Sequence, residues 1–256
     1  MGTVDIRLIA LDLDGTSLDS EREWHPSVAP AVHRAVEKGI QFCLASGRNA
    51  LSLKVKGDQL GIPYHRISSN GGLIQHADGP TLAHTALTHS VKELALRIAL
   101  ELDVHLNADG PDFVISRSET PWSDVYRRRA GVDVQVVPLD RFTHYETSKV
   151  IYIGKEEELD AVHHALLRDL DPLAVEIVRT EPDYLEILPA GVHKAAGLQV
   201  LCDHLGLTAD QVAAIGDYDN DLEMLRWAGV AAAVANANEL VKSVATRHFS
   251  SNDEGG

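Results

Sequence analysis

The stretch Ile6-Arg7-Leu8-Ile9-Ala10-Leu11-Asp12-Leu13-Asp14-Gly15-Thr16 decides the fold of this chain. It begins as a short apolar run, which is typical of a strand buried on both faces of a parallel sheet. The run ends in two carboxylates, Asp12 and Asp14, which lean to the same side of an extended backbone. Two such charges repel by about 4 kcal/mol at 4 Å and an effective dielectric of 20. The pair therefore predicts a bound cation, a shared proton, or both.

Composition limits the possible partners of the 256-residue chain. Hydrophobic residues make up 45% and charged residues 24%, as in ordinary globular proteins. The net charge of −15 argues against binding to nucleic acid or to an anionic membrane, because both need a basic surface. We find no apolar run near the ~20 residues of a membrane span and no signal peptide, so we expect a cytoplasmic protein. The oligomeric state stays open between monomer and homodimer.

The order of apolar and polar segments predicts an α/β fold. Strand and helix patterns alternate over the first part of the chain, and the apolar run 40–45 ends in Ser46-Gly47-Arg48. After about residue 77, strand pairs alternate with helices, and the first pattern returns near Gly191. We predict a doubly wound, Rossmann-like parallel sheet core formed by residues 1–77 and 190–256. Residues 78–189 are predicted to be an inserted α+β domain.

Polar side chains follow three of the predicted core strands. They are Asp12 with Asp14, Ser46, and Asp217 with Asp221, and Lys194 begins a helix where the core resumes. The carboxyl ends of the strands of such a sheet share one crevice. Oxygen ligands favour Mg²⁺, yet Mg²⁺ and one lysine bring only about +3 against four ionised aspartates, so one aspartate is predicted to hold a proton. A protonated acid beside a metal-bound carboxylate nucleophile is typical of phosphoryl transfer.

Four segments carry a resemblance to a known family. Asp12-Leu13-Asp14-Gly15-Thr16, Ala45-Ser46-Gly47-Arg48, Lys194 and the segment from Gly216 to Leu225 resemble, in order, the four motifs of the haloacid dehalogenase (HAD) superfamily. The insert between the second and third motifs is similar to the large cap of the Cof-type subfamily. Ser17, where the family usually has an apolar residue, and Ala195, where glycine commonly follows the lysine, depart from the pattern.

The resemblance implies a role for each matching residue. It implies that Asp12 is the nucleophile and Asp14 the general acid and base. It implies Mg²⁺ on Asp12, the backbone carbonyl of Asp14, and Asp217, with Asp221 as a further acidic group near the metal. The remaining expected positions are the phosphate-binding residues Ser46, Gly47, Lys194 and Asn220 and the possible substrate contacts Arg48 and Asn70.

We therefore expect a Mg²⁺-dependent phosphatase that acts on a small phosphorylated metabolite through an aspartyl phosphate. Two alternatives stay open at this point: a phosphomutase of the same fold, and a non-catalytic protein that binds phosphometabolites. Asp12-x-Asp14 alone would also suit a glycosyltransferase, and Asn70 could simply serve the turn at Gly71-Gly72. An EF-hand is excluded because Leu222 stands where a calcium loop needs glycine.

Overall fold

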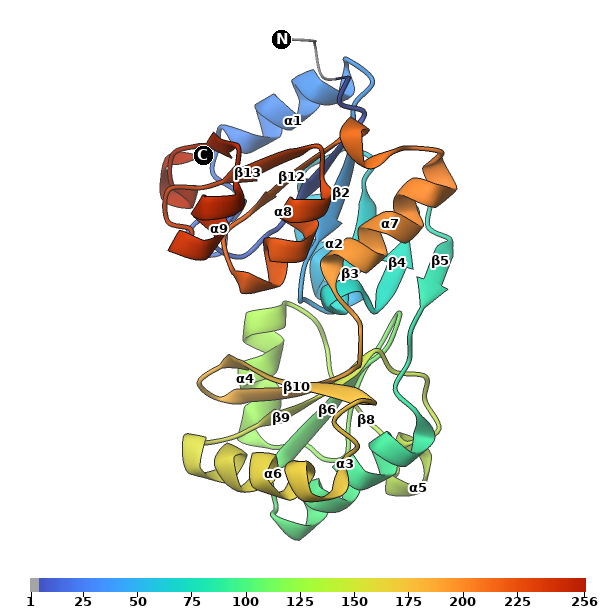
Figure 1. Ribbon diagram of the computed structural model, residues 1–256. Coiled ribbons are helices and arrows are strands. Elements are labelled where there is room, and N and C mark those ends of the chain that lie inside the picture. Colours follow the sequence, from blue (N-terminus) through green and yellow to red (C-terminus); the bar gives the residue numbers. More distant parts are fainter. Residues whose placement is uncertain (1–4) are drawn as a thin grey trace. The chain divides into compact units, whose positions relative to one another are not determined.

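The computed structural model describes residues 5–256, which divide into two compact units (Figure 1). The first unit comprises the described part of Met1–Gly47 with Leu53–Ala83 and His193–Gly256, and the second comprises Arg48–Ser52 and His84–Val192. We expected boundaries after residues 77 and 189, but the division falls after 83 and 192. Part of this difference has a simple cause: β5 (Thr81–His84) extends the sheet of the first unit.

The first unit is built on an eight-stranded sheet with the strand order β14-β13-β12-β1-β2-β3-β4-β5. β1 pairs in parallel with both β2 and β12, which confirms the predicted α/β sheet at its centre. β3 and β4 are antiparallel, a pairing that the sequence pattern did not predict. The remaining strands of this unit are β1 (Leu8–Leu11), β2 (Gln41–Ala45), β3 (His65–Ser68), β4 (Leu73–Gln75), β12 (Val212–Gly216), β13 (Val230–Ala233) and β14 (Arg247–His248).

Helices pack on both faces of this sheet, which explains why its central strands are apolar throughout (Figure 1). Leu8 and Ala10 face a core shared with α7, α8 and α9, whereas Ile9 and Leu11 face a core shared with α1. The helices are α1 (Val28–Val36), α2 (Ala50–Asp58), α7 (Lys194–Leu205), α8 (Leu222–Trp227) and α9 (Glu239–Val244), with short 3₁₀ turns at Ser69–Gly71, Ala209–Gln211, Asp219–Asp221 and Asn252–Glu254.

The chain's two cysteines lie in the same core of the first unit. Cys43 belongs to β2 and Cys202 to α7, and both side chains are fully buried and free. They contribute to packing as small apolar groups, as expected for buried free thiols.

The second unit contains a six-stranded sheet with the order β10-β11-β9-β6-β7-β8. Its pairings are antiparallel except for the short parallel pair β7–β8, in agreement with the expected α+β insert. The strands are β6 (His105–Asp109), β7 (Val114–Ser116), β8 (Gln135–Val136), β9 (Lys149–Ile153), β10 (Val175–Glu181) and β11 (Tyr184–Pro189). The helices are α3 (His89–Glu101), α4 (Pro121–Ala130), α5 (Leu139–Phe142) and α6 (Glu156–Asp169).

The two faces of this second sheet differ in chemistry. Leu106 and Ala108 of β6 face an apolar core with α3 and α6. On the alternate positions of β6, Asn107 and Asp109 are buried polar residues, and Tyr126 of α4 hydrogen-bonds to Asp109. Burial of polar groups without partners is costly; Asp109 has the Tyr126 hydroxyl as its partner, whereas Asn107 Nδ2 has no hydrogen-bond partner within the described part of the chain. Over the described residues, no helix has the length and apolar character needed to span a membrane.

Candidate active site

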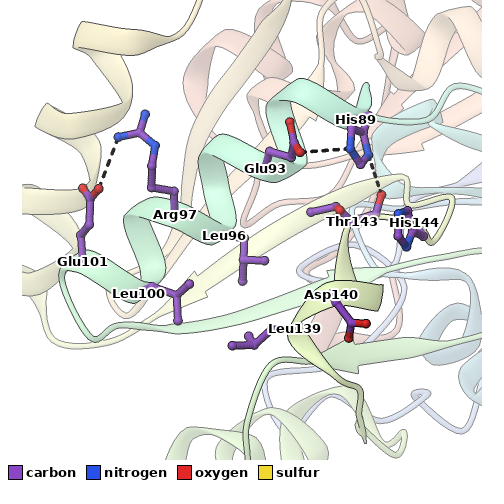
Figure 2. Close-up of a pocket in the computed structure, with 10 residues that line it drawn as sticks. All are labelled: His89, Glu93, Leu96, Arg97, Leu100, Glu101, Leu139, Asp140, Thr143 and His144. Atoms are coloured by element: carbon purple, nitrogen blue, oxygen red, sulfur yellow. Dashed lines mark hydrogen bonds and ion pairs between the residues drawn. The ribbon is translucent and has the colours of Figure 1, made fainter.

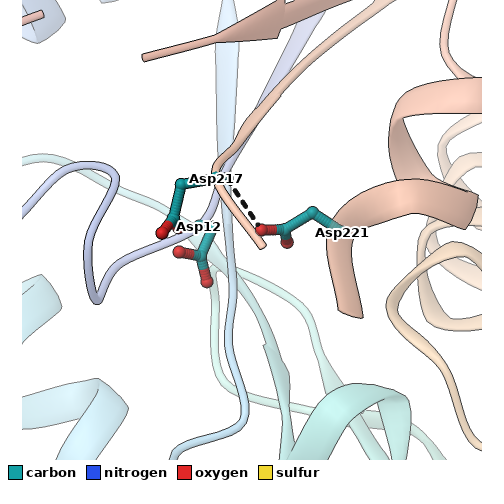
Figure 3. A group of neighbouring side chains, drawn as sticks. All are labelled: Asp12, Asp217 and Asp221. Carbon is teal, nitrogen blue, oxygen red and sulfur yellow. Dashed lines mark hydrogen bonds between the residues drawn. The ribbon is translucent and has the colours of Figure 1, made fainter. Parts of the chain in front are cut away.

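Three carboxylates that are distant in the sequence meet in the first unit. One oxygen from each of Asp12, Asp217 and Asp221 lies within 4.8 Å of the others (Figure 3). Asp12 directly follows β1, Asp217 directly follows β12, and Asp221 ends the 3₁₀ turn beyond it. Because β1 and β12 are parallel neighbours, their carboxyl ends lie at the same edge of the sheet.

Lys194 joins two of these carboxylates. It is the first residue of α7, it is 1% exposed, and its Nζ donates to Asp12 Oδ1 at 2.6 Å and to Asp221 Oδ1 at 2.7 Å. The other oxygen of Asp221 accepts the backbone N–H groups of Asp217 at 3.0 Å and Tyr218 at 3.3 Å. Asp221 therefore fixes both the lysine and the turn that carries Asp217.

The electrostatics of the cluster favour an additional positive charge. Burial raises the pKa of Asp12, and the Asp221 and Asp217 carboxylates add to this effect, while Lys194 opposes it. Burial likewise raises the pKa of Asp217, with Asp221 contributing. For Lys194, burial disfavours the charged form, but Asp12 and Asp221 outweigh it and its pKa lies above the usual value. Three carboxylates and one ammonium leave a charge of −2, and this all-oxygen donor set fits a divalent cation.

Residues next to Asp12 in the chain hold the cluster in place. Thr16 Oγ1 donates to Asp217 Oδ1 at 2.6 Å, and Ser17 Oγ donates to the backbone carbonyl of Asp12 at 2.6 Å. Gly15 has φ +80°, and a Cβ there would lie 2.5 Å from Asp217 Oδ2, so the turn needs glycine. The tight turn at Gly15 was expected from the sequence, whereas the hydrogen bonds of Thr16 and Ser17 were not predicted; the only signal for them was their adjacency to the acidic pair.

Asp14 is not one of the three carboxylates that converge in this cluster. Its side chain is exposed and does not belong to that group, and its backbone forms a bridge with Leu18. The metal contact predicted for Asp14 uses its backbone carbonyl, so its carboxylate was never required in the cluster. The position suits a group that exchanges a proton with substrate or water.

Three of the predicted phosphate-binding residues, Ser46, Gly47 and Asn220, are linked through Asn70. The Ser46 backbone carbonyl accepts the Asn70 N–H at 3.1 Å, and Asn220 Nδ2 donates to Asn70 Oδ1 at 3.2 Å. A Cβ on Gly47 would lie 3.2 Å from Asn70 Oδ1, so these two residues are close neighbours. Arg48 is grouped with the second unit, where its Nη1 donates to Ser52 Oγ at 3.2 Å.

A groove of about 480 Å³ in the second unit has different chemistry (Figure 2). It lies beside α3 and α5, and Leu96, Leu100 and Leu139 give it an apolar part. His89 is held by Glu93 at 3.2 Å and by the Thr143 carbonyl at 3.2 Å. None of the residues that line this groove is a predicted site residue, so it is not the candidate active site.

The family of the chain follows from a match over almost its whole length. Residues 9–256 match the model of the haloacid dehalogenase-like hydrolases, and the chain belongs to that family. The expected membership of the HAD superfamily and its Cof-type subfamily is thereby confirmed. The chain is an enzyme of this class, a HAD-type phosphatase.

Individual relatives are similar over most of their length. The chain is 28% identical over 255 residues to 5-amino-6-(5-phospho-D-ribitylamino)uracil phosphatase YitU of Bacillus subtilis, covering 97% of this chain and 94% of that protein. It is 30% identical over 236 residues to the HMP-PP phosphatase of Escherichia fergusonii, covering 90% and 85%. A crystal structure of a haloacid dehalogenase-like hydrolase from Bacteroides thetaiotaomicron superposes with a TM-score of 0.90 at 28% identity, covering 97% and 96%.

Proposed function

We propose that this protein is a Mg²⁺-dependent phosphatase that hydrolyses a small phosphomonoester through an aspartyl-phosphate intermediate. One observation carries the proposal: Asp12, Asp217 and Asp221 converge within 4.8 Å around the ends of two parallel strands, with the ammonium of Lys194 between two of them. A nucleophile, a cation site and a fixed positive charge are the components that phosphoryl transfer requires.

Asp12 is the nucleophile in this proposal. One of its carboxylate oxygens attacks phosphorus, the bond from phosphorus to the ester oxygen breaks, and the phosphoryl group is left on Asp12. Lys194 already donates to Asp12 at 2.6 Å, so its ammonium is in place to interact with the phosphoryl oxygens as they arrive. Ser46, Gly47 and Asn220 hold the remaining phosphoryl oxygens.

Asp14 moves the proton. It protonates the leaving ester oxygen in the first step and, in the second, takes a proton from the water that attacks phosphorus. The bond between phosphorus and the Asp12 oxygen then breaks, and inorganic phosphate leaves. Its exposure and its place two residues after Asp12 support this role.

The Mg²⁺ ion would be held by Asp12, Asp217 and the backbone carbonyl of Asp14. Asp221 would lie near the ion and support these ligands. Asp221 accepts from Lys194 and from two backbone N–H groups, so it supports the ligands more than it supplies one. When bound, Mg²⁺ supplies positive charge that stabilises the phosphoryl group during transfer.

The substrate is a small phosphate ester, and the second unit, as an inserted cap, sets which one. Arg48, which is grouped with that unit, is proposed to contact substrate. Two of the relatives are named for a ribitylaminouracil phosphate and for HMP-PP, so these compounds should be among the first in a screen of phosphorylated metabolites.

The test is release of phosphate from p-nitrophenyl phosphate with and without Mg²⁺. We expect Asp12→Asn to lose at least about 10³-fold in kcat, because the amide is a far weaker nucleophile than the carboxylate. Asp160→Asn in α6 of the second unit is the matched control and should retain activity. Retained activity in Asp12→Asn would reject the assignment, and exchange of phosphate between sugar phosphates without net release would favour a mutase.

A further inference from the structure

The turn Ser69-Asn70-Gly71 has an unusual backbone. All three residues have positive φ, at 50°, 55° and 109° respectively. Glycine adopts this region readily, whereas serine and asparagine do so at a cost, asparagine less than most. Ser69 and Asn70 are two of only four non-glycine residues with positive φ among residues 5–256. A strained conformation of this kind persists only where its surroundings hold it, and such positions cluster at functional sites.

Asn70 is held by two segments that carry predicted phosphate-binding residues. Its backbone N–H donates to the carbonyl of Ser46 at 3.1 Å, and its Oδ1 accepts from Nδ2 of Asn220 at 3.2 Å. Its amide also lies against Gly47, where an added Cβ would be 3.2 Å from Oδ1. One residue therefore joins the loop after β2 to the turn after β12.

Gly71 brings a third segment to the same turn. A Cβ at Gly71 would overlap the backbone carbonyl of His193, the residue that immediately precedes Lys194. The start of α7 thus packs directly on the backbone of this turn. The three segments that carry Ser46, Asn220 and Lys194 all touch residues 69–71, although they are far apart in the sequence.

We propose that Asn70 is a positioning residue, which acts on phosphate through Asn220 and does not itself need to contact the substrate. Its side-chain carbonyl fixes the amide of Asn220, and the left-handed turn keeps that amide in register with the Ser46 loop. Donors to a tetrahedral phosphate must be fixed closely, because small misplacements lower the rate strongly. The inference rests on the proposed function, in which Ser46, Asn220 and Lys194 bind phosphate.

A double-mutant cycle tests this role. Asn70→Gly keeps the backbone N–H and suits the left-handed conformation, so it removes only the side chain. We expect kcat/KM for p-nitrophenyl phosphate to fall about 10-fold in Asn70→Gly and at least as much in Asn220→Ala, whereas the double variant should be no more than about 2-fold worse than Asn220→Ala alone. Additive losses, or no loss in Asn70→Gly, would overturn the proposal.

The affinity for inorganic phosphate in the presence of Mg²⁺, measured by calorimetry, gives a readout that does not depend on turnover. We expect the same non-additive pattern in the phosphate affinities. These affinities test the role of Asn70 even if the wild-type protein proves inactive and the proposed function fails. The matched control is Asp103→Gly, which relaxes a left-handed residue of the second unit whose side chain is 97% exposed. It should leave both measurements unchanged, and Asn70→Gly should melt no lower than the wild type.

Discussion

Each unit of this protein buries carboxylates around one lysine. In both clusters the carboxylates outnumber the ammonium, but the excess negative charge differs. In the first unit, Lys194 lies 2.6 and 2.7 Å from oxygens of Asp12 and Asp221, with Asp217 close by. In the second, Lys149 lies 2.9 Å from Glu186 Oε2 and 4.0 Å from Asp109 Oδ2. In the first cluster, Asp12 and Asp217 directly follow strands, Asp221 ends a 3₁₀ turn and Lys194 begins α7, whereas the second cluster lies within strands β6, β9 and β11.

The Lys194 and Lys149 clusters differ in their net charge when every carboxyl group is ionised. Three carboxylates and one ammonium leave −2, which a divalent cation neutralises; two carboxylates and one ammonium leave −1, which a single proton neutralises. Burial, helped by Glu186, raises the pKa of Asp109 to about 7, while Lys149 and the Tyr126 hydroxyl oppose the shift. Burial raises carboxyl pKa values in both clusters, so the difference between them lies in the third carboxylate, which gives the first cluster the oxygen ligands and the charge that suit a divalent cation.

Replacing each lysine in turn should have the largest effect, and it should distinguish a cluster that acts in catalysis from one that only stabilises the fold. Lys194→Met and Lys149→Met both leave buried carboxylates without their cation, and each should lower the free energy of unfolding by about 3–5 kcal/mol. Only Lys194→Met should also lower kcat on p-nitrophenyl phosphate, by about 10³-fold. Urea unfolding and steady-state kinetics on the same samples check this. Equal losses of kcat in the two variants would contradict the distinction.

Asp109→Asn should reveal the proton held by the second cluster. With a pKa of about 7 in the folded chain against 3.8 ordinarily, Asp109 keeps a proton on folding that the unfolded chain loses. The contribution of Asp109 to wild-type stability should therefore fall as the pH rises from about 4 to 7 and then level off. The variant should match the wild type near pH 4 and be more stable by about 2–4 kcal/mol at pH 8.

The control for that experiment is Asp160→Asn, which removes a carboxylate from the exposed ion pair with Arg179. An exposed pair contributes little, so this change should leave the shape of the pH profile as it is. A stability difference between Asp109→Asn and wild type that is the same at pH 4 and pH 8 would show that Asp109 holds no extra proton.

The smallest expected effect concerns the metal. At a Mg²⁺ concentration ten times its Kd, the wild-type protein should gain about 1.4 kcal/mol of stability, because the ion binds only the folded cluster. Asp217→Asn should lose most of this gain, whereas Glu186→Gln in the second unit should keep it. Thermal unfolding with Mg²⁺ or with a chelator measures the difference. If Glu186→Gln abolished the stabilisation by Mg²⁺, the cation would bind the second cluster and not the first.

The sequence predicted the first cluster better than the second for a physical reason. Asp12 and Asp217 follow apolar runs that end abruptly, so each was visible in its own segment, and the parallel sheet then predicts that they meet. Lys149 and Asp109 lie opposite each other across β6 and β9. That pairing depends on the register of two strands about forty residues apart, and nothing in either segment specifies it.

The sequence pattern also did not predict the hydrogen bonds that support the active-site loops. Asn236 Nδ2 donates to the carbonyl of Gly15 at 2.7 Å, and no local signal near Asn236 indicates this. Likewise, β4 and β14 and the one-turn helix α5 were not predicted, because elements of two to four residues are too short to show a periodic pattern. The parallel sheet at the centre of the core and the positions of its acidic residues were the parts that local chemistry could specify.

The two buried cysteines allow opening of the first unit to be measured by thiol labelling. Both thiols are inaccessible there, and burial raises the pKa of Cys43 and brings that of Cys202 to about 11. A chromogenic aryl disulfide added to the native protein can therefore react only when the core around Cys43 or Cys202 opens. The labelling rate, followed by absorbance, would measure how often the core of the first unit opens, because both thiols lie in that unit.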